Sequence, residues 1–229
     1  MIILQTSIIA HRGASAAYAE NTLDAFRAAG PLGAEWVELD VRRTAEGALA
    51  VHHDAHLPDG RAIVELRAAD LPAAVPSLAE ALEACRPLGV NVEIKNSSHD
   101  VDFDATAALV EPVVAAIEEC SQPIIVSSFD VPTLARVRAV GPNIGCALLT
   151  FDLRDPQRTI DAVVAAGHVA LHPWDGTVTS ELVELVHDAG LKLNVWTVDD
   201  PARILELAEM GVDGIVTNVP DVAASVLRR

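Results

Sequence analysis

The chain has 229 residues, of which 51% are hydrophobic but only 3% aromatic, and it carries a formal net charge of −17. This length and composition are typical of one globular domain with a substantial core. The acidic balance argues against nucleic acid or an anionic membrane surface as the main partner, so a site for an anionic substrate must supply its own local positive charge.

Neither a membrane span nor a secretion signal is evident in the sequence. No apolar run approaches the roughly 18 residues that a membrane-spanning helix needs, and no basic segment precedes the apolar residues near the N-terminus. We therefore expect a cytoplasmic protein without stable membrane association. The sequence is also compatible with a homodimer.

Most of the chain repeats one pattern, in which a helical segment and a glycine precede a short apolar run that ends in polar residues. The apolar runs predict eight strands, at residues 7–10, 36–41, 90–95, 124–128, 144–149, 169–172, 191–198 and 214–217. Helices are predicted after them, at residues 22–29, 77–86, 104–119, 132–140, 156–166, 180–189, 201–209 and 220–227. Left-handed helix ends are expected at the glycines, namely Gly33, Gly89, Gly141, Gly167, Gly190 and Gly211.

Eight strand-and-helix units in a chain of this length indicate an α/β fold, a (β/α)8 TIM barrel that forms a single domain over residues 1–229. A doubly wound open sheet is the alternative, but the chain lacks the glycine-rich motifs that mark a nucleotide crevice. The one irregularity is a short excursion after the second strand, at residues 42–76. It begins on the carboxyl side of that strand, where such barrels carry their active sites.

Charged side chains gather where the first two strands end. His11 and Arg12 follow the first strand, and Glu38 and Asp40 lie two residues apart on the second. Alternate residues of a strand share one face, so the two carboxylates are expected side by side, roughly 7 Å apart. If they are buried they need a cation, whereas on an edge strand facing water they are ordinary salt-bridged acids.

The excursion supplies a second histidine. Leu49, Val51 and His53 share one face of a short alternating run, which aims His53 differently from His52. We expect His11 and His53 to carry protons, because the pKa of imidazole lies nearest to neutral pH.

The third strand repeats the spacing of the second, with Glu93 and Lys95 two residues apart. Taken alone, this pair is a simple ion pair along one strand. Beside Glu38 and Asp40, Glu93 completes three converging carboxylates, the oxygen-only set that Mg²⁺ or Ca²⁺ prefers. Arg12 and Lys95 then provide the positive charge that a phosphate oxygen anion needs.

In this order the motifs resemble the glycerophosphodiester phosphodiesterase family of the phospholipase-C-like barrel superfamily. The resemblance covers nearly the whole chain. It is carried by residues 9–13 (IAHRG), 20–22 (ENT), 25–26 (AF), 37–41 (VELDV), 53–54 (HD), 76–78 (PSL), 92–95 (VEIK), 127–130 (SSFD) and 195–198 (VWTV).

The resemblance implies metal-dependent hydrolysis of a glycerophosphodiester to glycerol 3-phosphate and an alcohol, an activity of glycerol and lipid metabolism. The substrate's own 2-hydroxyl would attack phosphorus and give a cyclic phosphate that water opens. The implied roles are acid/base catalysis by His11 and His53, binding of one Mg²⁺ or Ca²⁺ ion by Glu38, Asp40 and Glu93, phosphate binding by Arg12 and Lys95, contact with the metal and Arg12 region by Glu20, and lining of the glycerol and leaving-group pocket by Phe129 and Trp196. Core packing within the barrel is the alternative role of the two aromatic residues.

The chain also departs from the family pattern. Ala19 stands where a proline usually precedes Glu20, Asn218 replaces a frequent aspartate, and the excursion is short and lacks an Arg-Thr-Thr run. Because the excursion forms a wall of the substrate cleft, lysophospholipase D activity on lysolipids is an alternative if the cleft is apolar and open. A barrel that binds metal and phosphodiester without turnover is a third reading, against which the retention of both His11 and His53 argues.

Overall fold

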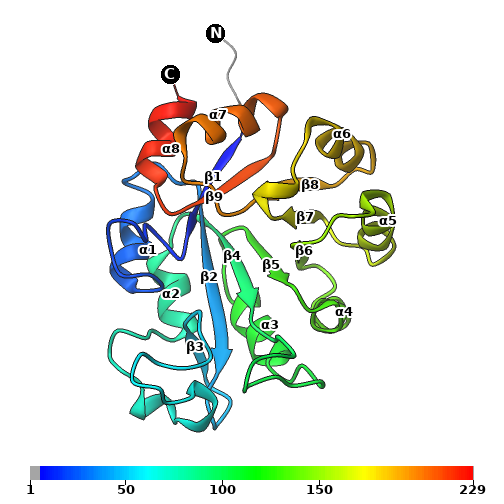
Figure 1. Ribbon diagram of the computed structural model, residues 1–229. Coiled ribbons are helices and arrows are strands. Elements are labelled where there is room, and N and C mark those ends of the chain that lie inside the picture. Colours follow the sequence, from blue (N-terminus) through cyan, green and yellow to red (C-terminus); the bar gives the residue numbers. More distant parts are fainter. Residues whose placement is uncertain (1–5, 229) are drawn as a thin grey trace.

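The structure is a computed structural model of the chain and describes residues 6–228 (Figure 1). Eight parallel strands of the described residues form a barrel, which is closed because β1 pairs with both β9 and β2. These strands are β1 (Ser7–His11), β2 (Trp36–Arg43), β4 (Gly89–Ile94), β5 (Ile124–Ser128), β6 (Gly145–Thr150), β7 (Ala170–Pro173), β8 (Lys192–Val195) and β9 (Gly214–Thr217). The predicted TIM barrel is confirmed.

The α-helices lie around the outside of the barrel, as Figure 1 shows. They are α1 (Leu23–Ala29), α2 (Leu78–Ala84), α3 (Val110–Glu118), α4 (Val131–Val140), α5 (Pro156–Ala165), α6 (Ser180–Asp188), α7 (Pro201–Met210) and α8 (Pro220–Leu227). Asp130, Asp155 and Asp200 begin three of them by accepting a hydrogen bond from a backbone amide of the first turn, and each is followed by a proline in that turn. In the described residues, no helix combines the length and the apolar character needed to cross a membrane.

The alternation of β2 separates the core from the barrel interior. Val37, Leu39 and Val41 are completely buried in the apolar core that the helices complete. Burial of such a side chain contributes roughly 1.5–3 kcal/mol. Glu38 and Asp40, the residues between them, consequently face the inside of the barrel, as the sequence predicts.

The excursion is a small structure with its own core. Its strand β3 (Leu49–Val51) pairs antiparallel with the end of β2, and it contains the short 3-10 helices Ile63–Glu65 and Ala68–Asp70. Ala50, Leu57 and Ile63 form a separate apolar cluster beneath the loop. A third 3-10 helix, Asp175–Thr177, follows β7.

Two predictions about local structure are wrong. The helix expected from residue 104 begins only at Val110, because Asn96 holds the backbone of Asp104 in a loop through two hydrogen bonds. Gly89 and Gly141 do not adopt the left-handed conformation; Gly89 opens β4, where the ring of Trp36 leaves no room for a Cβ atom. The left-handed conformation is present at the other four glycines, Gly33, Gly167, Gly190 and Gly211.

Candidate active site

Three buried carboxylates meet at the carboxyl ends of β2 and β4. Asp40 and Glu93 are partners in the strand register, and Glu38 lies two residues earlier on β2. One oxygen of each carboxylate lies within 4.8 Å of the others. Oxygen ligands of a hard divalent cation stand at 2.0–2.6 Å from it and therefore at most about 5 Å from one another, so this spacing fits one such ion.

Two cations flank the carboxylates. Lys95 Nζ lies 2.6 Å from Glu93 Oε1 and 3.1 Å from Asp40 Oδ1, and Arg12 Nε lies 3.3 Å from Asp40 Oδ2. Glu38 is different, because its Oε2 accepts a hydrogen bond from the backbone N–H of Arg12 while the buried Oε1 has no partner. The existing charges therefore neutralise Asp40 and leave Glu38 without a cation.

The pKa values of the three acids follow this division. Burial raises the pKa of Glu38 well above its usual value, and the charges of Asp40 and Glu93 raise it further. Burial also raises the pKa of Glu93, although Lys95 opposes the shift. Burial alone would raise the pKa of Asp40 as well, but Lys95 and Arg12 hold it at about 2. The pKa values of Glu38 and Glu93 are raised because burial makes the charged form of a carboxylate unfavourable. A divalent cation beside Glu38 and Glu93 would stabilise the charged forms.

A tight turn after β1 aims Arg12 into the site. Arg12 itself has a φ of 56°, and Gly13, with a φ of 80°, packs so closely that a Cβ atom would lie 2.6 Å from the backbone of Ala25. Arg12 Nη1 donates to both carboxylate oxygens of Glu20 at 2.9 Å. Glu20 thus lies at the exposed edge of the site and positions the Arg12 guanidinium.

His11 presents one ring nitrogen to the site. Its Nδ1 donates to Asn218 Oδ1 at 2.8 Å, and Asp199 in turn holds Asn218 through its backbone and side-chain N–H groups. Nε2 is left 3.9 Å from Glu38 Oε2. Burial lowers the pKa of His11, and Arg12 lowers it further, so the neutral ring with a free Nε2 is favoured at neutral pH.

His53 faces the same cavity from the excursion. Its Nδ1 lies 2.7 Å from Asp54 Oδ1, while burial and the charge of Lys95 lower its pKa. Arg42 Nε donates to the backbone carbonyl of His53 at 2.7 Å, and the same guanidinium makes two 2.8 Å hydrogen bonds to the buried Asp102. Arg42 thereby connects the backbone of His53 in the excursion to Asp102 in the loop after β4.

Aromatic rings form the opposite wall of the cavity. Phe129 stacks on Phe151 at 5.2 Å between ring centroids, and the Trp196 ring packs edge-on against both, at 5.5 and 4.8 Å. Phe129 and Trp196 both line this cavity, and their predicted contact with the glycerol and the leaving group stays a prediction. Phe151 was missed, although its place directly after β6 (Gly145–Thr150) is the same kind of strand-end signal.

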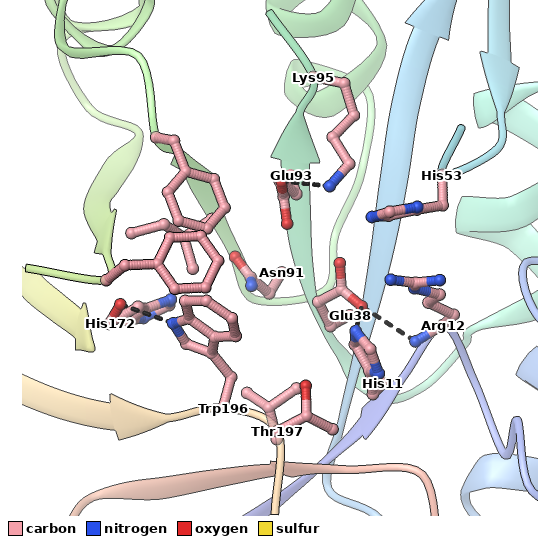
Figure 2. Close-up of a pocket in the computed structure, with 14 residues that line it drawn as sticks. His11, Arg12, Glu38, His53, Asn91, Glu93, Lys95, His172, Trp196 and Thr197 are labelled. Atoms are coloured by element: carbon pink, nitrogen blue, oxygen red, sulfur yellow. Dashed lines mark hydrogen bonds and ion pairs between the residues drawn. The ribbon is translucent and has the colours of Figure 1, made fainter. Parts of the chain in front are cut away.

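The floor of the cavity contains two neutral polar residues that sequence reasoning missed or left undecided, Asn91 and His172. Asn91 lies two residues before Glu93 on β4, and the strand alternation could have revealed it. His172 ends the inner face of β7 and is completely buried. Figure 2 shows both residues among those that line the cavity, together with the charged groups and Trp196.

The structure brings most of the predicted residues to this one cavity, lined by His11, Arg12, Glu38, His53, Glu93, Lys95, Phe129 and Trp196 among others. Two predicted residues lie beside the cavity. Glu20 is at its edge, and Asp40 is behind it, with its oxygens bonded to Lys95, Arg12 and Asn21. An anion entering the cavity therefore meets two fixed cations, a candidate cation site and two imidazoles.

The chain is similar in sequence to known phosphodiesterases. The model of the glycerophosphoryl diester phosphodiesterase family matches residues 11–222. A glycerophosphodiester phosphodiesterase of Caldanaerobacter subterraneus is 31% identical, covering 99% of both chains. Another of Bacillus altitudinis is 32% identical, covering 96% of this chain and 98% of that protein.

Solved structures share the fold along almost the whole chain. A putative glycerophosphoryl diester phosphodiesterase from Silicibacter pomeroyi superposes with a TM-score of 0.88 at 27% identity, covering 97% of this chain and 93% of that one. A phosphodiesterase from Oleispira antarctica, solved with its product sn-glycerol 3-phosphate, gives a TM-score of 0.89 at 24% identity, covering 98% of both chains.

Proposed function

The chain belongs to the glycerophosphoryl diester phosphodiesterase family, and from this premise we propose that it hydrolyses glycerophosphodiesters to glycerol 3-phosphate and an alcohol with the help of one divalent cation. The observation that carries the proposal is that two cations, two imidazoles and the carboxylates of Glu38 and Glu93 line one cavity, with the buried Asp40 directly beside them. Such a set suits a phosphodiester anion, which must be neutralised before it can be attacked.

Glu38, Asp40 and Glu93 would hold the cation, because their oxygens have the spacing of one ligand set and Glu38 Oε1 has no other partner. Bound there, Mg²⁺ or Ca²⁺ supplies positive charge to the phosphate oxygens and lowers the barrier to attack. The described residues offer carboxylate oxygens at this position and no sulfur ligand, which suits a hard ion such as either of these.

Arg12 and Lys95 bind the remaining phosphate oxygens. Both guanidinium and ammonium groups are held in place by carboxylates, Arg12 by Glu20 and Asp40 and Lys95 by Glu93 and Asp40. Because their orientation is fixed before the substrate arrives, little reorganisation is needed when charge develops on phosphorus.

His11 and His53 move the protons. One imidazole, neutral with a free Nε2, accepts the proton of the substrate's 2-hydroxyl as its oxygen forms the new bond to phosphorus, and the other, entering the step as imidazolium, gives its Nε2 proton to the alcohol oxygen as the old phosphorus–oxygen bond breaks. Water then opens the cyclic phosphate with the two roles exchanged. Each ring has its Nδ1 occupied by a neighbour, Asn218 or Asp54, which leaves Nε2 for the substrate.

The test measures release of glycerol 3-phosphate from glycerophosphocholine with Mg²⁺, Ca²⁺ or EDTA, for the wild type and His11→Ala. We expect turnover with a cation, none with EDTA, and a loss of roughly 10²–10⁴-fold in the variant. Activity that survives both the chelator and the substitution would contradict the mechanism.

The aromatic wall favours lysophospholipase D activity as a second candidate. Phe151 is 62% exposed and continues the wall from Trp196 and Phe129 to the surface, so an acyl chain could rest on it. Comparing kcat/KM for glycerophosphocholine and for lysophosphatidylcholine below its micellar concentration separates the two. A ratio in favour of the lysolipid would make it the main substrate.

A further inference from the structure

His172 has a hydrogen-bonding group for which residues 6–228 offer no partner. The ring is completely buried, and burial lowers its pKa to about 3, so it is neutral at physiological pH. Its Nε2 lies 2.9 Å from Nδ2 of Asn194. An amide nitrogen can only donate, so Nε2 must accept, and the proton of the neutral ring is on Nδ1.

The Nδ1–H of His172 has no partner among the described residues, and His172 lines the cavity. A buried donor left unpaired is unfavourable by roughly 1–3 kcal/mol. Asn194 thus acts as a positioning residue, because its hydrogen bond to Nε2 fixes the proton of the His172 ring on Nδ1. The neighbouring Trp196 is fixed by the same strand, because its Nε1 donates to the His172 carbonyl at 2.7 Å.

Asn91 offers a matching acceptor in the same cavity. It is only 2% exposed, and its Oδ1 has no hydrogen-bond partner. Asn91 is the register partner of Glu38 on β2, so its side chain starts from the residue next to the candidate cation site. In Figure 2 the Asn91 amide points from β4 toward the part of the cavity that His172 and Trp196 border.

From these two groups we infer that the cavity floor is a binding subsite for a neutral hydroxyl group, with His172 Nδ1–H as donor and the Asn91 amide oxygen as acceptor. A hydroxyl both accepts and donates, whereas an anion would be repelled by Glu38 and Asn91 Oδ1 and a cation by the Nδ1–H group.

The substrate supplies one hydroxyl that fits. This step rests on the proposed function, in which the phosphate lies at Arg12 and Lys95 and the 2-hydroxyl reacts. The hydroxyl left over is the primary one at the far end of the glycerol, and the floor lies beyond the carboxylates as seen from the excursion that carries His53 (Figure 2). His172 and Asn91 therefore select for glycerol over three-carbon units that lack this hydroxyl.

The first experiment uses the wild type alone. Glycerophosphocholine is compared with its analogue in which a methyl group replaces the far CH₂OH and the 2-hydroxyl is kept. A site built around a hydroxyl leaves its own groups unpaired when the hydroxyl is absent, so we expect kcat/KM for the analogue to be lower by roughly tenfold or more. Equal kcat/KM values would overturn the inference while leaving the proposed phosphodiesterase activity intact.

The second experiment uses variants. In Asn91→Leu and His172→Phe we expect the ratio of kcat/KM for the two substrates to fall toward one. Asn91→Leu leaves the His172–Asn194 hydrogen bond in place, so it tests the subsite even if His172→Phe does not fold. His168→Phe is the matched control, because His168 is also a buried histidine with an unpaired Nδ1 but does not line the cavity.

Three results distinguish the possibilities. A ratio that collapses in Asn91→Leu and stays at the wild-type value in His168→Phe supports the subsite. A ratio that Asn91→Leu leaves unchanged means that the floor holds only structural water, and the inference is wrong. A wild type that hydrolyses no glycerophosphodiester contradicts the proposed function and this inference with it.

Discussion

The two halves of the barrel's carboxyl end bury polar groups in opposite ways. At β1, β2 and β4 the buried groups around the cavity are charged apart from Asn91, and Asp40, Lys95 and Arg12 compensate one another within about 3 Å. At β7 and β8 they are neutral, and His172 and Asn194 pair without any ion. Each half nevertheless leaves buried atoms unpaired on the cavity side, Glu38 Oε1 in the first and His172 Nδ1 in the second.

Under the proposals made above, the two halves bind different parts of one ligand. An unpaired carboxylate oxygen in a buried site calls for a cation, whereas an unpaired N–H group on a neutral ring calls for a neutral acceptor. Loss of a charged group should therefore act on the reaction rate, and changes in the neutral half should act on substrate selection and stability.

The largest effect is expected in the charged half, for Glu38→Gln. Removing this charge weakens the cation site and with it the stabilisation of the phosphate charge. Because that stabilisation contributes several kcal/mol, kcat/KM should fall roughly 10³-fold. Steady-state hydrolysis of glycerophosphocholine over a series of Mg²⁺ and Ca²⁺ concentrations measures it. Glu35→Gln, at the opposite end of β2 and bonded to the backbone of Ile8, is the control and should retain wild-type activity; equal losses in both variants would contradict the assignment.

A somewhat smaller loss is expected for His53→Asn. General acid/base catalysis typically contributes at least about 10²-fold, and kcat should fall by this factor while the dependence on metal concentration stays unchanged. His52→Asn is the matched control, because the adjacent histidine does not line the cavity and its Nδ1 bonds to the backbone of Asp54. Similar activities of the two variants would exclude His53 as a proton carrier.

A modest effect is expected in the aromatic wall, for Phe151→Ala. The variant loses contacts to Phe129 and Trp196, and aromatic pairs contribute roughly 0.5–1.5 kcal/mol beyond area burial. KM should rise by roughly 2- to 10-fold with kcat unchanged. Phe103→Ala removes another exposed ring, 40% exposed against 62% for Phe151, that does not line the cavity, and an equal rise of KM in that control would mean that the wall has no specific role.

The smallest effect on turnover is expected from protonation of His172. This protonation should instead lower the free energy of unfolding by a defined amount. Its folded-state pKa of about 3 lies below the unfolded value of 6.5, so its stabilising contribution is present above pH 6.5 and is lost as the pH falls toward 3. Between pH 7 and pH 5 this loss amounts to about 2 kcal/mol. Guanidinium unfolding at both pH values measures it.

The difference between wild type and His172→Phe isolates this contribution from the acids of the charged half. Glu38, whose pKa is raised, contributes with the opposite sign, and Asp40, with a pKa of about 2, stays ionised in this range. A free energy of unfolding that changes equally between pH 7 and pH 5 in both proteins would contradict the buried neutral state of His172.

Much of this protein was determined by local sequence pattern. Strand alternation alone placed Glu38 and Asp40 on one face with Val37 and Leu39 on the other, and the structure has them so. The repeated strand-and-helix pattern predicted the barrel, because each amphipathic segment must bury its apolar face against the next. The same pattern predicted that the charged residues at the strand ends lie together at the carboxyl end of the barrel.

Only the tertiary structure decided which groups meet and how each is protonated. Asn218 reaches His11 across 207 residues of chain, and Asp102 reaches Arg42 across 60. Such contacts leave no local periodicity, because they exist only after the sheet has closed. The tautomer of His172 likewise depends on Asn194 from the neighbouring strand. The sequence by itself therefore determined which chemical groups stand at the barrel's end, and closure of the barrel decided which atoms remain free for a ligand.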